Sequence, residues 1–191
     1  MRRKRARTSL RERYPALPIH LVGHSFGARA VVSAVAQLPP GGAPVSLSLL
    51  QAAFSHNALA AKVDGTRDGA FRTVLQDNRA TGPIIVTHTK NDRSVGIAYP
   101  LASRIAQDNS ASLGDKNDPY GGLGRNGALH TPEVNTAEAF LREWDVSAPY
   151  NFSPGAVYNL ESDHFIENHS AVMGVQVAYA TLQAMRNALA H

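Results

Sequence analysis

The segment from residue 19 to residue 38 constrains the fold of this chain more than any other, because it predicts a strand, a tight turn and a helix in succession. It begins with a short apolar run, Ile19-His20-Leu21-Val22, which ends at Gly23 as a buried strand would. An apolar helix is predicted from residue 26 to residue 38, where Pro39-Pro40-Gly41-Gly42 stops it. A strand and a helix this apolar each need another layer of structure to pack against.

The rest of the chain continues this alternation. Further strands are predicted at residues 45–50, 84–88 and 156–160, and helices at 71–75, from Pro100, at 136–144 and from about Ser170. A long loop rich in Gly, Asn and Asp is predicted at 108–133. The pattern indicates an α/β domain with about four parallel strands and crossover helices. Apolar positions of the last helix predict one packed face, made of Val172, Val175, Tyr179, Leu182, Met185 and Leu189.

Positive charge is concentrated at the start of the chain. Residues 1–13 hold seven of the 19 basic residues and one of the 15 acidic ones, so 12 basic and 14 acidic residues remain for the rest. We expect a basic helical lead-in at 1–18 and a domain at 19–191, and a solvated surface helix is favoured over a nucleic-acid patch.

No apolar run approaches the ~18 residues of a membrane span, and no secretory signal follows the arginines, which favours a cytoplasmic protein.

The turn between the first strand and helix carries the strongest chemical signal. Gly23-His24-Ser25-Phe26-Gly27 matches the pattern G-x-S-x-G in the strand-turn-helix setting that this motif requires. A serine becomes a useful nucleophile only when a base takes its proton and fixed donors meet the charge that develops on the substrate oxygen. We expect Gly23 and Gly27 to permit close approach of strand and helix, Ser25 to be held exposed and strained, and the Phe26 N–H to serve as an oxyanion donor.

Residues 19–36 resemble the nucleophile elbow of the α/β-hydrolase family, in the Gly-His-Ser-x-Gly form seen among lipases and esterases. That family places its acid after a later strand and its histidine after the last strand. The resemblance implies Asp92 as the acid, because it follows the strand at 84–88. His169 is the favoured base because it precedes the final helix, with Ser170 as a possible N-cap. His164 is the alternative base.

The resemblance covers only the later half of the family fold. It implies four strands before Ile19, where the chain has eighteen residues, so we expect a truncated domain. The loop that carries the family's second oxyanion donor has no counterpart. The strand at 19–22 would be central in the family, and without an earlier neighbour it would present an unpaired edge open to self-association or to a completing chain.

Three hypotheses for the function follow. The first is a serine hydrolase that cleaves a small-molecule carboxylic ester, or a related acyl bond, through a Ser-His-Asp triad and an acyl-enzyme. The second is a truncated, weak or inactive hydrolase relic that acts as an interaction module. The third is a nucleic-acid binder that uses residues 2–13. No cofactor and no metal are implied. Cysteine is absent, and a metal cluster of Asp163, His164, Glu167 and His169 is disfavoured.

Overall fold

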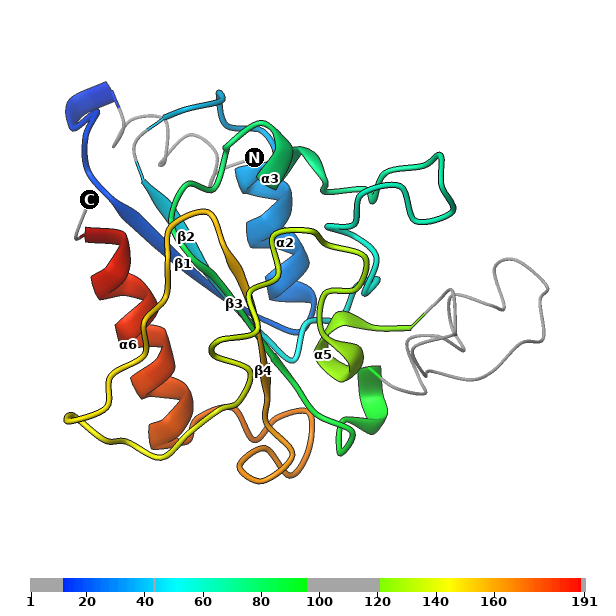
Figure 1. Ribbon diagram of the computed structural model, residues 1–191, viewed down its shortest axis with the longest axis vertical. Helices are drawn as coiled ribbons and strands as arrows, with labels where there is room; N and C mark the ends of the chain where they lie inside the picture. The colour runs from blue at the N-terminus through cyan, green and yellow to red at the C-terminus, as the bar shows by residue number, and fades with distance from the viewer. Residues whose placement is uncertain (1–11, 43, 96–120, 190–191) are drawn as a thin grey trace.

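A four-stranded parallel sheet forms the centre of the molecule, in a computed structural model that describes residues 12–42, 44–95 and 121–189 (Figure 1). The strand order is β1-β2-β3-β4, which is also the order along the chain. The strands are β1 (Ile19–His24), β2 (Val45–Leu50), β3 (Ile84–His88) and β4 (Val157–Glu161). Helices α2 (Phe26–Val35), α3 (Thr73–Gln76) and α5 (Leu123–Asn126) lie between strands in sequence, and α6 (Val175–Leu189) follows the last strand. The predicted α/β class with four parallel strands is confirmed.

Some predictions fall on segments outside the described residues. These are the helix from Pro100, most of the basic lead-in at 1–18, and the part of the predicted loop 108–133 that precedes residue 121. The described remainder of that loop contains the short helix α5. The third hypothesis, binding of nucleic acid through residues 2–13, also rests largely on residues outside the described ranges.

Two hydrophobic cores lie on opposite faces of the sheet. All six residues of β2 are buried, and successive side chains of a strand point to opposite faces. Leu47 and Leu49 therefore pack with α2, while Leu50 packs with α6. Figure 1 shows α2 and α6 covering the two faces of the sheet. Burial on both faces extends to Ser46 and Ser48, whose small side chains occupy the positions of β2 between its apolar residues.

The helix predicted at 136–144 is wrong, because this segment lies extended along β4. The backbone N–H of Leu141 donates to the carbonyl of Glu161, and the N–H of Glu161 donates to the carbonyl of Ala139, both at 2.9 Å. Val134 and Phe140 form isolated parallel bridges to β4. The otherwise unpaired edge of β4 offers this segment backbone partners, and these outweigh a local helical preference.

The last helix begins at Val175, later than predicted, and it buries a different face. Residues 170–174 are not helical, so Ser170 is not its N-cap. The side chains of Ala180 and Ala184 are fully buried against the sheet, whereas Val175 and Leu182 are 50% and 54% exposed. The predicted packing face is therefore wrong for Val175, Leu182 and Met185, whereas Tyr179 is buried as predicted. The small side chains of Ala180 and Ala184 let α6 lie close to the sheet. The spacing of large apolar residues in the sequence does not indicate this contact.

Strand β1 is the edge of the sheet, since it pairs only with β2 among the described strands. It contains no Lys, Arg, Asp or Glu, and Val22 is 48% exposed. The expected exposed edge is therefore present in the described part of the chain. Uncharged edge strands without proline present free backbone groups to which another strand can bind.

Candidate active site

Ser25 occupies a sharp turn between the end of β1 and the start of α2. Its backbone angles are φ 55° and ψ −129°, an unusual conformation for a residue with a side chain. Its N–H donates to the carbonyl of Leu50 at 3.1 Å, and its own carbonyl accepts from the N–H of Ala53 at 3.2 Å. The end of β2 therefore holds Ser25 from both sides, which maintains a backbone conformation that would otherwise be unfavourable.

The two glycines of the motif have different roles. A Cβ atom on Gly23 would lie 2.5 Å from the Cα of Ala28 and 2.7 Å from the carbonyl oxygen of Gly27. Gly23 therefore permits the close approach of β1 and α2, as expected. A Cβ on Gly27 meets nothing within 4 Å in the described residues. The close-approach interpretation holds for Gly23 and not for Gly27 in this part of the molecule.

Three residues far apart in the sequence meet beyond the carboxyl ends of the strands. The side chain of Ser25 follows β1, Asp92 follows β3, and His169 follows β4. The Nε2 of His169 lies 2.8 Å from the Oγ of Ser25, and its Nδ1 lies 2.8 Å from the Oδ2 of Asp92. In a parallel sheet these strand ends share one edge, so loops far apart in sequence can meet there. The structure thus brings together the three side chains predicted for the triad.

Asp92 is completely buried, whereas the side chain of His169 is 20% exposed. A buried carboxylate needs donors to offset its lost hydration. The N–H of Val95 donates to Oδ1 at 2.9 Å, and the side-chain Nε2 of Gln51 donates to Oδ2 at 3.1 Å. Together with His169, three donors therefore meet this carboxylate. The prediction from sequence did not include Gln51 or Val95, because nothing in a motif marks residues that meet Asp92 only in the folded chain.

The loops that carry Asp92 and His169 are tied to each other. The side-chain amide of Asn91 donates to the carbonyls of Asp163 and Ile166 at 2.9 and 3.1 Å. The N–H of Lys90 donates to Oδ1 of Asp163 at 2.8 Å. These bonds fix the loop after β4 against the loop after β3, so the distance between Asp92 and His169 does not depend on a single contact.

His24, the variable residue before the serine, also contacts His169. Its Nε2 lies 2.8 Å from the backbone carbonyl oxygen of His169, and the two rings lie 4.8 Å apart between centroids. In the sequence, His24 is marked only by its position inside the motif. The sequence predicts no role for it, because its partner His169 is close only in the folded chain.

His164, the alternative base, lies elsewhere. Its side chain is exposed, and its ring contacts the ring of Phe165 at 4.8 Å between centroids. The hydrogen bonds to Ser25 and Asp92 belong to His169. The geometry therefore distinguishes the two histidines that the sequence left open.

Phe26 is the first residue of α2, and its side chain is 65% exposed. Backbone N–H groups in the first turn of a helix lack intrahelical acceptors and carry the positive end of the helix dipole. The N–H of Phe26 directly follows Ser25 and makes no hydrogen bond to a described residue. It is therefore available to a negatively charged oxygen next to Ser25.

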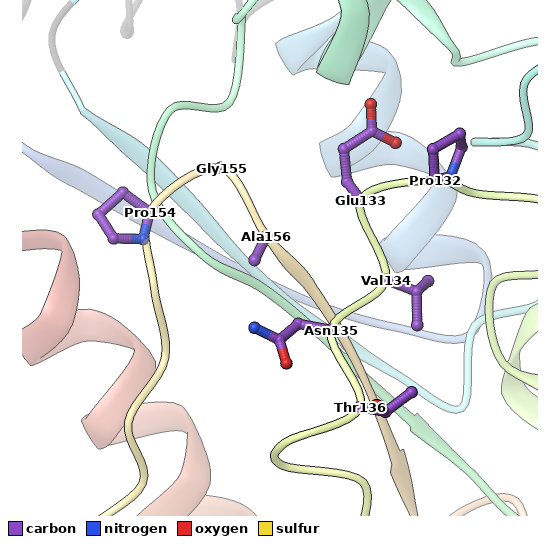
Figure 2. A pocket seen from close by; sticks show the side chains of 8 residues that line it. All are labelled: Pro132, Glu133, Val134, Asn135, Thr136, Pro154, Gly155 and Ala156. Atoms are coloured by element: carbon purple, nitrogen blue, oxygen red, sulfur yellow. The ribbon is translucent and has the colours of Figure 1, made fainter.

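Among the described residues, no group of three His, Asp or Glu side chains converges as metal ligands would. A surface hollow lined by residues 132–136 and 154–156 lies at the amino end of β4 (Figure 2). That is the end of the sheet opposite to Ser25, because the strands are parallel. Glu133 on its rim pairs with Arg72 through two bonds of 2.6 Å.

Within the described ranges, no helix has both the length and the apolar character to cross a membrane.

Comparisons of this chain with protein-family models, with curated proteins and with solved structures found no significant match.

Proposed function

We propose that this chain is a serine hydrolase of the α/β-hydrolase type that cleaves small-molecule carboxylic esters or related acyl bonds. One observation carries the proposal: His169 bridges Ser25 and Asp92 through two contacts of 2.8 Å, at a serine with φ 55°. Asp92 fixes the histidine tautomer with the proton on Nδ1, which leaves Nε2 free to accept the proton of Ser25. This is the arrangement that acyl transfer to a serine needs.

Acylation uses these groups in sequence. The Oγ of Ser25 attacks the ester carbonyl carbon while its proton moves to Nε2 of His169. The carbonyl π electrons move to the oxygen, and the N–H of Phe26 donates to the oxyanion. When the tetrahedral intermediate collapses, the bond to the alcohol oxygen breaks, and Nε2–H protonates the departing alkoxide. The products are an ester on Ser25 and a free alcohol.

Deacylation repeats the steps with water as the nucleophile. His169 takes a proton from water, which attacks the acyl carbon of the ester on Ser25. The second oxyanion is stabilised by the same N–H of Phe26, and its collapse breaks the bond to Oγ. The proton on Nε2 returns to Oγ, a carboxylic acid leaves, and the free enzyme is restored. Buried Asp92 keeps its charge and stabilises the imidazolium in both halves.

A fluorophosphonate probe and an activated ester test the proposal on the full chain. Covalent labelling and ester hydrolysis are expected for the wild type and lost in Ser25→Ala. Ser55→Ala is the matched control, because Ser55 also has a histidine as its sequence neighbour but follows β2 without an elbow. That variant should label as the wild type does. Labelling that persists in Ser25→Ala contradicts the assignment of the nucleophile.

The exposed edge of β1 supports a second candidate function, association with a second copy of the chain through this strand. The observation that favours it is an uncharged edge strand, with Val22 48% exposed. Val22→Lys places a charge on this edge, and Val175→Lys is the matched control, because Val175 is 50% exposed on α6. Analytical ultracentrifugation should show association of the wild type and of Val175→Lys, and its loss in Val22→Lys. A wild type that stays monomeric at all concentrations contradicts this candidate.

A further inference from the structure

Gln51 is a fully buried polar residue immediately after β2, and its backbone is unusual. Its φ of 41° lies in the left-handed region, which a residue with a side chain seldom adopts. Its N–H donates to the Oγ1 of Thr87 on β3 at 3.1 Å. This bond holds the backbone in a conformation that turns the chain out of the sheet. A residue keeps an unfavourable backbone conformation of this kind only where its surroundings hold it there. The contacts of Gln51 therefore need an explanation.

The side-chain amide of Gln51 can point only one way. Its Nε2 lies 3.1 Å from Oδ2 of Asp92 and 2.8 Å from the carbonyl oxygen of Gly124. A carboxylate and a carbonyl only accept hydrogen bonds, so the NH₂ group must face both of them. Rotation of the amide by half a turn would place its oxygen against two acceptors. The amide therefore acts as a rigid two-donor fork between Asp92 and α5.

This orientation leaves the other end of the amide unsatisfied. The Oε1 of Gln51 is buried and has no hydrogen-bond partner in the described part of the chain. A buried carbonyl without a donor is unfavourable, and a residue such as methionine would fill the same space without that penalty. Packing alone therefore does not explain a glutamine here. The two donated hydrogen bonds are what the glutamine adds.

The Oδ2 of Asp92 is the atom that connects Gln51 to the site. It accepts from Gln51 Nε2 and from His169 Nδ1, while Oδ1 accepts from the N–H of Val95. Donors on both oxygens fix the plane of the carboxylate. Asp92 is completely buried, so these donors offset the hydration that its carboxylate loses on folding.

We infer that Gln51 is a positioning residue, which holds the Asp92 carboxylate so that Oδ2 meets Nδ1 of His169. This inference rests on the proposed hydrolase function for its effect on turnover, but the geometry that it asserts does not depend on catalysis. The side-chain hydrogen bonds of Gln51 go to Asp92 and Gly124 and not to Ser25 or His169. Gln51 acts through Asp92, and it couples the acid to α5 through the carbonyl of Gly124.

The first test measures the Asp92–His169 contact directly. The Nδ1 proton of His169 gives a proton NMR resonance that is assigned by its loss in His169→Gln. Gln51→Met keeps the length of the side chain and removes both donors, and it should shift or broaden this resonance. Gln183→Met is the matched control, because Gln183 is a buried glutamine on α6 away from Asp92. An unchanged resonance in folded Gln51→Met overturns the inference, whether or not the chain cleaves esters.

The second test uses turnover. Gln51→Met removes a hydrogen bond to a charged group. We expect kcat to fall by about 10- to 100-fold and KM to stay within about twofold of the wild-type value. In Gln51→Glu, a protonated carboxyl can donate to Oδ2 of Asp92, whereas an ionised one repels it. Its activity relative to wild type should therefore rise as the pH falls from about 8 to about 5.5, while the ratio for Gln51→Met stays flat. Equal, pH-independent losses in both variants overturn the positioning role in favour of packing.

Different results would contradict the hydrolase function and the positioning role of Gln51. A wild type that neither labels nor cleaves esters, combined with a His169 resonance that responds to Gln51→Met, contradicts the hydrolase and supports the positioning role. An active wild type whose resonance and kcat are unaffected by Gln51→Met contradicts the positioning role alone. Thermal unfolding of each variant confirms that the compared proteins are folded.

Discussion

The Nε2 of His24 lies 2.8 Å from the backbone carbonyl oxygen of His169, across 145 positions of the chain. A carbonyl oxygen only accepts, so Nε2 of His24 carries the proton. The two imidazole rings also contact each other, with an interplanar angle of 41°. The residue before the proposed nucleophile therefore fixes the loop that carries the proposed base.

Loss of this contact should slow ester hydrolysis without preventing binding. His24→Phe keeps an aromatic ring against His169 but removes the donor. One hydrogen bond of this kind contributes about 0.5–1.5 kcal/mol, which corresponds to roughly a 2- to 10-fold lower kcat. We expect KM to change little, as steady-state kinetics with an activated ester will measure. His24→Gln retains an amide donor, so its kcat should fall less than that of His24→Phe. An identical fall in kcat in both variants would argue against a role for the hydrogen bond.

The two motif glycines should differ sharply in their tolerance of alanine. Gly23→Ala places a Cβ 2.5 Å from the Cα of Ala28, so β1 and α2 must separate. We expect it to lower the free energy of unfolding by about 2–4 kcal/mol. Gly27→Ala meets no described atom within 4 Å, and alanine favours the helix by up to about 1 kcal/mol. Urea denaturation of both variants measures the contrast, and equal destabilisation would contradict it.

Burial of His20 should make the fold sensitive to acid. Desolvation lowers the pKa of His20 from 6.5 to about 4, while its ring contacts the hydroxyls of Ser46 and Ser48 at 2.7 and 3.0 Å. Between pH 6.5 and 4 the unfolded chain binds a proton at His20 that the folded chain does not. Stability from this residue is therefore present above pH 6.5 and is lost as the pH falls towards 4.

The size of this effect is modest, because His20 is only half-buried and solvent screens part of the shift. We expect a loss of about 1–3 kcal/mol in the free energy of unfolding over that pH range. Urea denaturation at pH 7 and pH 4.5 will show a smaller pH dependence in His20→Gln than in the wild type. His164→Gln, which changes an exposed histidine, is the control and should leave the dependence unchanged.

Substitutions on α6 test which face of this helix is packed. Ala184 is fully buried, so Ala184→Leu forces three extra carbons into the core and should cost about 1–3 kcal/mol. Leu182 is 54% exposed, and Leu182→Ala should change the free energy of unfolding by no more than about 0.5 kcal/mol. Thermal or urea unfolding distinguishes them. A large loss in Leu182→Ala would restore the packed face that the apolar spacing predicted.

The sequence predicted the strands well, because each is a short segment rich in apolar and β-branched residues. It predicted β2 and β3 with their observed bounds, and β1 and β4 to within one or two residues. It failed at residues 136–144, where pairing with the edge of β4 outweighs local preference. On α6 it was right for Tyr179, which is buried, and wrong for Val175 and Leu182, because the face towards the sheet is formed largely by alanines.

The sequence by itself determined the strand-turn-helix around Ser25 and the order in which Ser25, Asp92 and His169 occur. These are local properties, set by backbone preference and by residue type near each turn. Only the tertiary structure decided that His169 and not His164 meets Ser25, and that Gln51 and His24 hold Asp92 and His169 in place. Such contacts form between loops that are distant along the chain. They exist only because parallel strands bring their carboxyl ends to one edge of the sheet.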